Sequence, residues 1–273
     1  MAGNQRVMEV CNEVTSKYES YIPNKLNQIK HTEKTLTIFH QNICDLNKKE
    51  ELSHSLMEHP VRIICLTEHH LHDGELEGMI FNKYALGAKF CRKAHKGGDV
   101  CILIDVNLHF TNINMDKYSE ERDDEICAIR VYTPSCQTMV MTVYRSPTGD
   151  ITNFLNTLET TIDKLYNNTT NLIICGDFNI NYLSDNKEKQ KLNSLLNSYS
   201  LYSVIEFPTR TKNTTSTAID NVFINNFKHE NYKIYPLIKG LSDHDVQVLN
   251  LYLQACPTTE MSYLLTGKLM NTH

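Results

Sequence analysis

A short apolar run that ends in polar residues decides the expected fold: residues 172–179 are LIICGDFN. Its first four residues are all apolar, which is typical of a strand buried on both faces. Gly176 allows a tight turn there, and Asp177 and Asn179 follow it. Because functional side chains gather where buried strands end, this stretch predicts a strand that delivers polar groups to one rim of a sheet.

Similar apolar runs elsewhere in the chain predict further strands. With the first one, the expected strands span residues 36–41, 63–67, 100–104, 126–132, 139–144, 172–175, 218–223 and 246–253. The expected helices span residues 48–58, 151–166 and 187–199. Several strands are apolar at nearly every position, so both of their faces should be covered by helices or by a second sheet. The pattern therefore predicts a layered α/β sandwich.

The chain divides into three predicted segments. Its 273 residues, 41% of them hydrophobic, suffice for one large domain, which we place at residues 34–254. Residues 1–33 are predicted to be an N-terminal helical leader, because apolar residues recur at helical spacing from Val7 to Tyr18. Residues 255–273 are polar and unpatterned, and we expect them to form a C-terminal tail.

Targeting and redox signals are sparse. The sequence has no run of about 18 apolar residues, so no membrane-spanning helix and no membrane partner are expected. The first residues lack the apolar core of a signal peptide, which predicts an intracellular protein that is not secreted. The 9 cysteines form no Cys-x-x-Cys pair, and three that lie in apolar runs are expected to be buried thiols: Cys65, Cys101 and Cys175.

The charge of the chain limits how it can bind nucleic acid. A formal net charge of −5 excludes the strongly basic class of non-specific DNA binders. Any contact with DNA must then rest on a local patch, and the best candidate within residues 83–96 consists of Lys83, Lys89, Arg92, Lys93 and Lys96. The acidic run at residues 120–125 is expected to be a solvated loop.

Polar residues also end or follow other predicted strands, and their chemistry suits a metal-dependent reaction. Carboxylate and amide oxygens without a thiol or imidazole cluster fit a hard cation such as Mg²⁺. Glu68, Asp243 and Asn42 form such a ligand set. Cleaving a phosphodiester requires the developing charge on phosphate to be neutralised, which a bound cation can do.

A base and an acid are also available at the same strand ends. Asp177, beside Asn179, could orient and deprotonate a water molecule. His244 could donate a proton or hydrogen bond to a phosphate oxygen, with the carboxylate of Asp220 fixing its tautomer. Each of these residues has a structural alternative, since Asp177 could cap a helix or start an Asx turn. A zinc site built from the scattered histidines, or a nucleophilic Cys44, is disfavoured because neither has suitably placed partners.

The order of these motifs resembles a known superfamily. Along residues 35–253 the chain carries, in this order, Asn42, Thr67-Glu68, Tyr144, Gly176-Asp177-Phe178-Asn179, Ile219-Asp220 and Ser242-Asp243-His244. This order is similar to the motif set of the endonuclease/exonuclease/phosphatase superfamily. Flanking residues resemble the endonuclease domains of non-LTR (LINE-type) retrotransposons: His40-Gln41-Asn42-Ile43, Gly97-Gly98, Tyr144-Arg145-Ser146-Pro147 and Phe207-Pro208-Thr209-Arg210.

The resemblance implies a fold and an activity. The fold would be a four-layer α/β sandwich of the DNase I-like type, with two packed mixed β-sheets flanked by helices. The activity would be Mg²⁺-dependent nicking of double-stranded DNA, with Mn²⁺ as a substitute, leaving a 3′-hydroxyl that primes reverse transcription. The partners would be DNA and a reverse transcriptase supplied elsewhere, and a DNA substrate would place the protein in the nucleus. The oligomeric state is left open.

The resemblance also implies roles for single residues. Glu68 would hold Mg²⁺, with Asn42 and Asp243 contributing. Asp177, supported by Asn179, would activate the attacking water. His244, oriented by Asp220, would stabilise the transition state, and Tyr144 would hydrogen-bond the scissile phosphate. The residues that would contact the substrate are Arg145, Asn179, Lys93, Lys96 and Arg210.

The sequence departs from abasic-site endonucleases in two ways, and two alternatives to the DNA-nicking function stay open. Cys44 stands where abasic-site endonucleases carry a metal-linked acidic residue, and the chain has no Trp, so efficient repair of abasic sites is not expected. One rival is a phosphoesterase of the same fold that acts on RNA, a phospholipid or an inositol phosphate. The other is a catalytically decayed domain that only binds nucleic acid.

Overall fold

The computed structural model describes residues 35–46, 49–58, 61–95, 97–133, 137–166, 171–225, 231–238 and 241–253. The predicted leader at 1–33, the predicted tail at 255–273 and Lys96 lie outside the described residues. The two domain boundaries therefore stay predictions. None of the described helices is long and apolar enough to cross a membrane.

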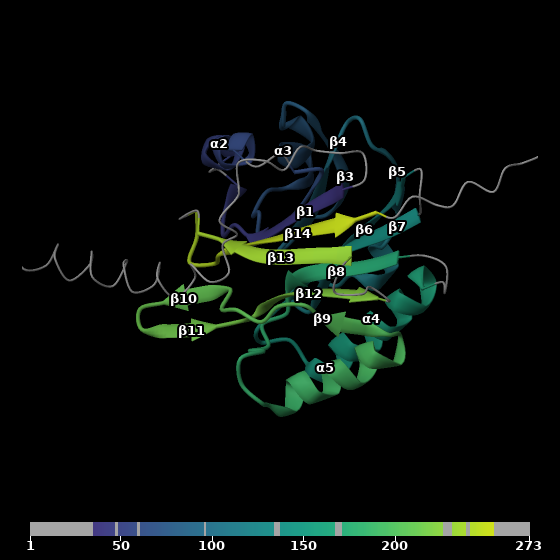
Figure 1. Cartoon of the computed structure of the whole chain (residues 1–273), viewed down its shortest axis with the longest axis vertical. Helices are drawn as coiled ribbons and strands as arrows, with labels where there is room; N and C mark the ends of the chain where they lie inside the picture. The colour runs from purple at the N-terminus through teal and green to yellow at the C-terminus, as the bar shows by residue number, and fades with distance from the viewer. Residues whose placement is uncertain are drawn as a thin grey trace, which may run out of the picture.

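Two six-stranded sheets form the centre of the molecule (Figure 1). The first has the order β13 (Tyr232–Leu237), β14 (Val246–Tyr252), β1 (Thr35–Asn42), β2 (Ile63–Thr67), β4 (Val100–Asp105) and β3 (Tyr84–Phe90). The second has the order β5 (His109–Ile113), β6 (Asp124–Tyr132), β7 (Gln137–Arg145), β8 (Asn171–Asp177), β12 (Asp220–Asn225) and β9 (Leu201–Ser203). Both sheets are mixed, because β1–β2 and β7–β8 pair in parallel and the other pairs are antiparallel.

The remaining elements are short helices and a ribbon. The helices are α2 (Lys49–Glu58), α3 (Asp73–Gly78), the 3-10 turn η3 (Asp116–Tyr118), α4 (Ile151–Leu165) and α5 (Lys187–Ser198). Strands β10 (Arg210–Lys212) and β11 (Thr215–Thr217) form a separate two-stranded ribbon that projects beside the sheets (Figure 1).

The alternation of side chains along the strands creates two apolar cores. In β1, Ile38 packs into the core shared with the second sheet, whereas its neighbour Phe39 packs toward Leu52 of α2 and Leu76 of α3. The second sheet is covered on its other side by α4 and α5 (Figure 1). The layers are therefore α2 and α3, the first sheet, the second sheet, and α4 and α5. The predicted four-layer sandwich of two packed mixed sheets is confirmed.

Helix α4 shows how the sequence sets these layers. The side chain of Asp150 caps the helix by accepting hydrogen bonds from the backbone N–H groups of Thr152 and Asn153, at 2.7 and 2.9 Å. Phe154, Leu158 and Ile162 recur every fourth residue and are buried against the second sheet. Each buried side chain of this size contributes about 1.5–3 kcal/mol, so the apolar stripe fixes the helix on the sheet.

The predicted turn at Gly176 is wrong. Strand β8 continues through Gly176 to Asp177. A Cβ at position 176 would collide with the backbone carbonyl of Val143 on β7. Glycine is therefore required for the close approach of two strands, not for a turn.

Candidate active site

The register of the two sheets brings the predicted residues to one rim. In the first sheet, Asn42 pairs with Thr67, so Glu68 follows the neighbouring strand at the same level. In the second sheet, Asp177 pairs with Tyr144 on one side and with Asp220 on the other. Parallel pairing within β1–β2 and β7–β8 places the carboxyl-terminal ends of these strands together, and antiparallel pairing brings Asp220, the first residue of β12, beside Asp177.

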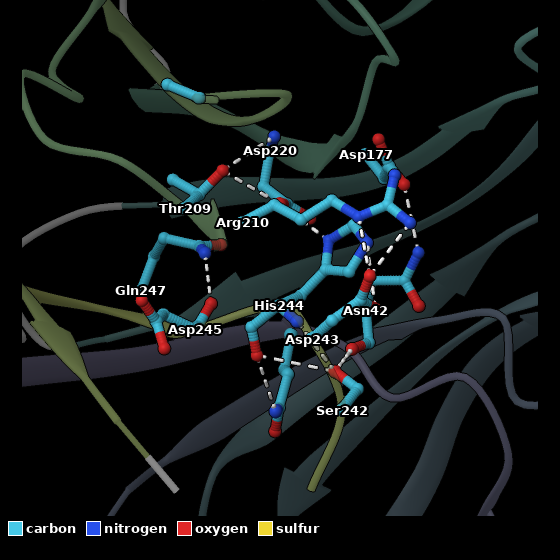
Figure 2. A network of polar contacts seen from close by, with 12 residues as sticks. Asn42, Asp177, Thr209, Arg210, Asp220, Ser242, Asp243, His244, Asp245 and Gln247 are labelled. Carbon is cyan, nitrogen blue, oxygen red and sulfur yellow. Dashed lines mark hydrogen bonds and ion pairs between the residues drawn. The ribbon is translucent and has the colours of Figure 1, made fainter. Parts of the chain in front are cut away.

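A hydrogen bond joins the two sheets at this rim. The Nδ2 of Asn42 donates to Oδ2 of Asp177 at 2.9 Å (Figure 2). The other oxygen of Asp177 accepts from the backbone N–H of Asn179 at 3.0 Å, and the side chain of Asn179 donates to the carbonyl of Arg145 at 2.8 Å. Asn179 adopts a positive φ of 51°, a conformation that Asn tolerates better than most residues. Asp177 is therefore held from both sides.

The electrostatics around Asp177 suit a group that exchanges a proton. Burial, and after it the negative charge of Asp220, raise the pKa of Asp177 to about 8 against the opposing effect of His244. A nearby cation would favour the charged form. This environment is typical of a carboxylate that acts as a base.

His244 is fixed by its carboxylate partner. Its Nδ1 lies 2.8 Å from Oδ2 of Asp220, and the hydroxyl of Thr209 donates to the same oxygen at 2.8 Å (Figure 2). The carboxylate accepts, so Nδ1 carries a proton and Nε2 is the atom left for chemistry. Burial alone lowers the pKa of His244, but the charge and hydrogen bond of Asp220, together with the charge of Asp177, outweigh it and raise the pKa to about 9. The imidazole is therefore a cation at neutral pH.

Asp243 pairs with the ribbon. Both Nε and Nη2 of Arg210 lie 2.8 Å from Oδ2 of Asp243, while Oδ1 lies 3.9 Å from Nε2 of His244. Burial raises the pKa of Asp243, but the hydrogen bond from Arg210 and the charges of His244 and Arg210 together lower it below its ordinary value, so the carboxylate is charged. Arg210 was predicted to contact DNA; its side chain is 31% exposed and also anchors Asp243.

Glu68 lies at the same rim in a strained backbone conformation. Its φ is +55°, and its carboxylate lies 3.7 Å from Nε2 of His70. Burial raises the pKa of Glu68, but hydrogen bonds from His70, Asn42 and Tyr144 outweigh it and lower the pKa below the ordinary value. The pKa of Tyr144 is raised far above its ordinary value by burial and by Glu68, so its hydroxyl remains a donor. Glu68 is therefore a charged carboxylate that can serve as a ligand for a metal cation.

The structure does not present Arg145 on the site surface. Its side chain is 3% exposed, and its guanidinium donates to the backbone carbonyls of Phe178 and Gly149 at 3.3 and 3.1 Å. It also lies over the ring of Phe154, 5.8 Å from the ring centroid. These contacts hold the loop that carries Asp177 and Asn179.

The expected basic patch within residues 83–96 is not a continuous exposed surface. Lys89 pairs with Asp73 and Glu77, and Arg92 is buried. Lys93 is exposed on the surface, and Lys96 lies outside the described residues. The expectation of one patch is wrong, because acidic side chains from neighbouring segments neutralise part of it.

The expectation of a solvated acidic loop at residues 120–125 is also wrong. Asp124 and Glu125 begin β6 and are 3% and 0% exposed. Glu125 forms a buried ion pair with Arg92, and the guanidinium lies over the ring of Tyr144. Burial raises the pKa of Glu125 to about 7 despite Arg92. The sequence did not predict that the buried pair of Arg92 and Glu125 would hold a guanidinium over the ring of Tyr144.

The donors at the rim fit a divalent cation. Carboxylates outnumber the cationic groups Arg210 and His244, and Oδ1 of Asp220 is buried without a hydrogen-bond partner among the described residues. Two groups of side chains have ligand atoms within 4.8 Å of one another: Asp177, Asp220 and His244, and Cys44, Asp243 and His244. Glu68 belongs to neither group, so the predicted ligand set is spread over the rim.

Comparisons with known proteins show that the fold is a known one. Residues 138–248 match a family model described as endonuclease-reverse transcriptase. The endonuclease domain of TRAS1, a telomere-specific non-LTR retrotransposon, superposes with a TM-score of 0.66 at 16% identity, covering 81% of this chain and 99% of that domain. The chain therefore has the DNase I-like fold of the endonuclease/exonuclease/phosphatase superfamily, and residues 138–248 are similar to endonuclease-reverse transcriptase proteins.

Other solved structures share this fold. The 3′-5′ exonuclease NExo from Neisseria meningitidis gives a TM-score of 0.61 at 15% identity over 79% of this chain and 99% of that one. TDP2 from D. rerio, complexed with a single-strand DNA product, gives a TM-score of 0.55 at 12% identity, over 79% of this chain and 98% of that one. A search of curated proteins finds no match to the sequence.

Proposed function

We propose that this protein belongs to the endonuclease/exonuclease/phosphatase superfamily and is a Mg²⁺-dependent endonuclease that nicks double-stranded DNA and leaves a 3′-hydroxyl end. One observation carries the proposal: the hydrogen bond from Asn42 to Asp177 brings a buried base next to the Asp220–His244 pair. A base and a cationic donor on one rim are the groups that phosphodiester hydrolysis needs. The match of residues 138–248 to endonuclease-reverse transcriptase proteins supports DNA as the substrate.

The cation would lie among oxygen donors. Glu68 would hold it, with Asn42 and Asp243 contributing directly or through water, and Mn²⁺ would substitute for Mg²⁺. When bound, the ion would supply charge neutralisation for the phosphate and its leaving oxygen. Because Glu68 and Asp243 both have lowered pKa values, both are charged at neutral pH and ready to bind.

The protein side chains divide the remaining chemistry. Asp177, oriented by Asn42 and Asn179, takes the proton of a water whose oxygen attacks phosphorus in line. The bond from phosphorus to the 3′ oxygen breaks, and that oxygen takes a proton from solvent to give a 3′-hydroxyl beside a 5′-phosphate. His244 donates from Nε2 to a phosphate oxygen, and Tyr144 donates from its hydroxyl.

The proposed contacts with DNA come from a few basic side chains. Arg210 and Lys93 are exposed at least in part, and Lys96 completes the proposed contacts. Since the chain is acidic overall, binding should depend on these positions and weaken as salt rises. A reverse transcriptase supplied elsewhere would extend the new 3′ end, which would place the reaction in the nucleus.

The test compares substrates with one protein preparation. Supercoiled plasmid, single-stranded RNA, a phosphomonoester and an inositol phosphate are incubated with Mg²⁺ or with EDTA. We expect open-circle DNA with Mg²⁺ only, and direct extension of the nick by a DNA polymerase. Faster turnover of the RNA or of a soluble phosphoester would transfer the proposal to that substrate. Binding of DNA without any turnover would support a decayed domain.

A further inference from the structure

Cys44 places a sulfur atom at the edge of an otherwise oxygen-rich site. Its thiol lies 3.4 Å from Oδ1 of Asn42 and 3.9 Å from Oδ1 of Asp243. Nε2 of His244 lies 3.9 Å from the same Asp243 oxygen. One ligand atom each from Cys44, Asp243 and His244 thus falls within 4.8 Å of the others.

These separations are close to those of a tetrahedral zinc site. With zinc–sulfur bonds of about 2.3 Å and zinc–nitrogen or zinc–oxygen bonds of about 2.0–2.1 Å, tetrahedral ligands lie about 3.3–3.6 Å apart. The separations of Oδ1 of Asp243 from Sγ of Cys44 and from Nε2 of His244, 3.9 Å each, need to shorten by only a few tenths of an ångström. Sγ and Nε2, which lie within 4.8 Å of each other, need to move closer as well. The half-buried Cys44 and the partly exposed Asp243 can supply that movement.

Two of the three ligands are already oriented. Nδ1 of His244 is bonded to Asp220, which Thr209 holds in turn, so Nε2 faces the other donors. A carboxylate behind the second nitrogen is the usual support of a metal-binding histidine. The backbone N–H of Cys44 donates to Oδ1 of Asn42 at 3.1 Å, which fixes the residue at a φ of +56°.

We propose that Cys44, Asp243 and His244 form a binding site for a thiophilic divalent cation such as Zn²⁺. A sulfur–nitrogen–oxygen ligand set selects Zn²⁺ over Mg²⁺, which prefers oxygen alone. On binding, the ion replaces the protons on Sγ of Cys44 and Nε2 of His244, which pass to solvent, and water fills the fourth position.

The occupied site inhibits the nuclease, a step that rests on the proposed function. Zn²⁺ occupies the nitrogen that would donate to the phosphate. It also occupies Oδ1 of Asp243, so this oxygen cannot serve a Mg²⁺ ion. Zinc binding and turnover are therefore mutually exclusive, and zinc acts as a reversible inhibitor through Cys44.

The binding test uses Co²⁺ as a spectroscopic probe for the full chain. Wild type should show a thiolate-to-cobalt charge-transfer band that saturates at one ion per chain and disappears when Zn²⁺ is added. Cys44→Ser, which retains the other thiols, should lose the band and bind Zn²⁺ at least about tenfold more weakly. Cys91→Ser, with a buried thiol elsewhere, is the matched control and should keep the band.

The activity test is independent of basal rate. Each protein is assayed for plasmid nicking with excess Mg²⁺ and stoichiometric Zn²⁺, relative to its own rate without Zn²⁺. Wild type and Cys91→Ser should lose activity, and Cys44→Ser should not. An unchanged cobalt band in a folded Cys44→Ser protein, or equal zinc inhibition of all three, overturns the proposal. Wild type that binds Co²⁺ through Cys44 but never nicks DNA contradicts the proposed function alone.

Discussion

Asn42 and Asp177 lie at strand ends of different sheets, and the amide of Asn42 donates a 2.9 Å hydrogen bond to the carboxylate of Asp177. Both side chains are buried, at 1% exposure each. The position of the proposed base therefore depends on how the two sheets pack, not on one loop. This contact links the stability of the sandwich to the geometry of its rim.

Asn42→Ala should weaken both properties. It leaves Oδ2 of Asp177 without its donor, which should lower the free energy of unfolding by about 1–3 kcal/mol. Loss of the oriented base should lower the nicking rate by about 100-fold or more. Urea unfolding and plasmid nicking measure the two effects. A variant that nicks DNA at the wild-type rate would show that this amide does not position Asp177.

The pH dependence of nicking should report His244. Its pKa is raised to about 9, since the charge and hydrogen bond of Asp220, with the charge of Asp177, outweigh the effect of burial. The donor proton on Nε2 is therefore lost as pH rises through that value. We expect activity to decline above about pH 9. In Asp220→Asn the decline should move toward the ordinary imidazole value of 6.5. A pH–rate profile with the same alkaline decline in both proteins would assign it to another group.

Asp124 should make the fold less stable at neutral pH than at acid pH. Burial raises its pKa from 3.8 to about 6, so the folded protein favours the protonated acid. The stabilising contribution is complete below about pH 4 and is lost as pH rises through 6. Asp124→Asn imitates the protonated acid, so it should gain up to about 3 kcal/mol at pH 8 and little at pH 4. Equal differences in unfolding free energy at both pH values would contradict this.

Gly98→Ala should damage the support of Tyr144. Gly98 has a φ of +87°, and a Cβ there would collide with the guanidinium of Arg92. We expect a loss of about 1–3 kcal/mol in unfolding free energy, together with slower nicking, because Arg92 lies over the ring of Tyr144.

Gly74→Ala is the control, since nothing lies within 4 Å of a Cβ at position 74 and alanine is favoured in a helix. A Gly98→Ala protein as stable as Gly74→Ala would mean that Arg92 moves aside freely.

The central strands were predictable because each is a short run of consecutive apolar residues, which indicates burial without knowledge of the rest of the chain. Residues 172–175 are apolar at each position and lie in the middle of the second sheet. All eight predicted strands and all three predicted helices are present, although the strand predicted at 218–223 begins and ends two residues later, as Asp220–Asn225. The predicted bounds also placed Asn42 and Asp177 just after strands, whereas Asp220, which was expected inside a strand, begins β12.

The edge strands were not predictable in this way. Strand β13 contains Pro236, which argues against a strand in a sequence, but β13 lies at a sheet edge where proline is tolerated. Strand β5 is largely exposed and carries no apolar run. Such strands form because a neighbouring strand offers hydrogen bonds, and the identity of that neighbour is a tertiary property.

Charged residues that are buried in the fold were missed for a similar reason. Glu125 looks like one residue of a solvated acidic run, yet it is buried because Arg92, far away in the sequence, neutralises it. Arg145 looks like a DNA contact, yet it spans a loop and donates to backbone carbonyls. The roles of the rim residues follow from the resemblance and from their geometry, and they stay predictions until the variants are assayed.

The most direct measurement is conversion of supercoiled plasmid to open circle by wild type, Asp177→Asn and Asp163→Asn, with Mg²⁺ and with EDTA. Asp163 is an exposed carboxylate of α4 and serves as the matched control. We predict Mg²⁺-dependent nicking by wild type and Asp163→Asn, and a loss of about 100-fold or more in Asp177→Asn. Equal nicking by all three folded proteins, or nicking that persists in EDTA, would contradict the proposed metal-dependent site.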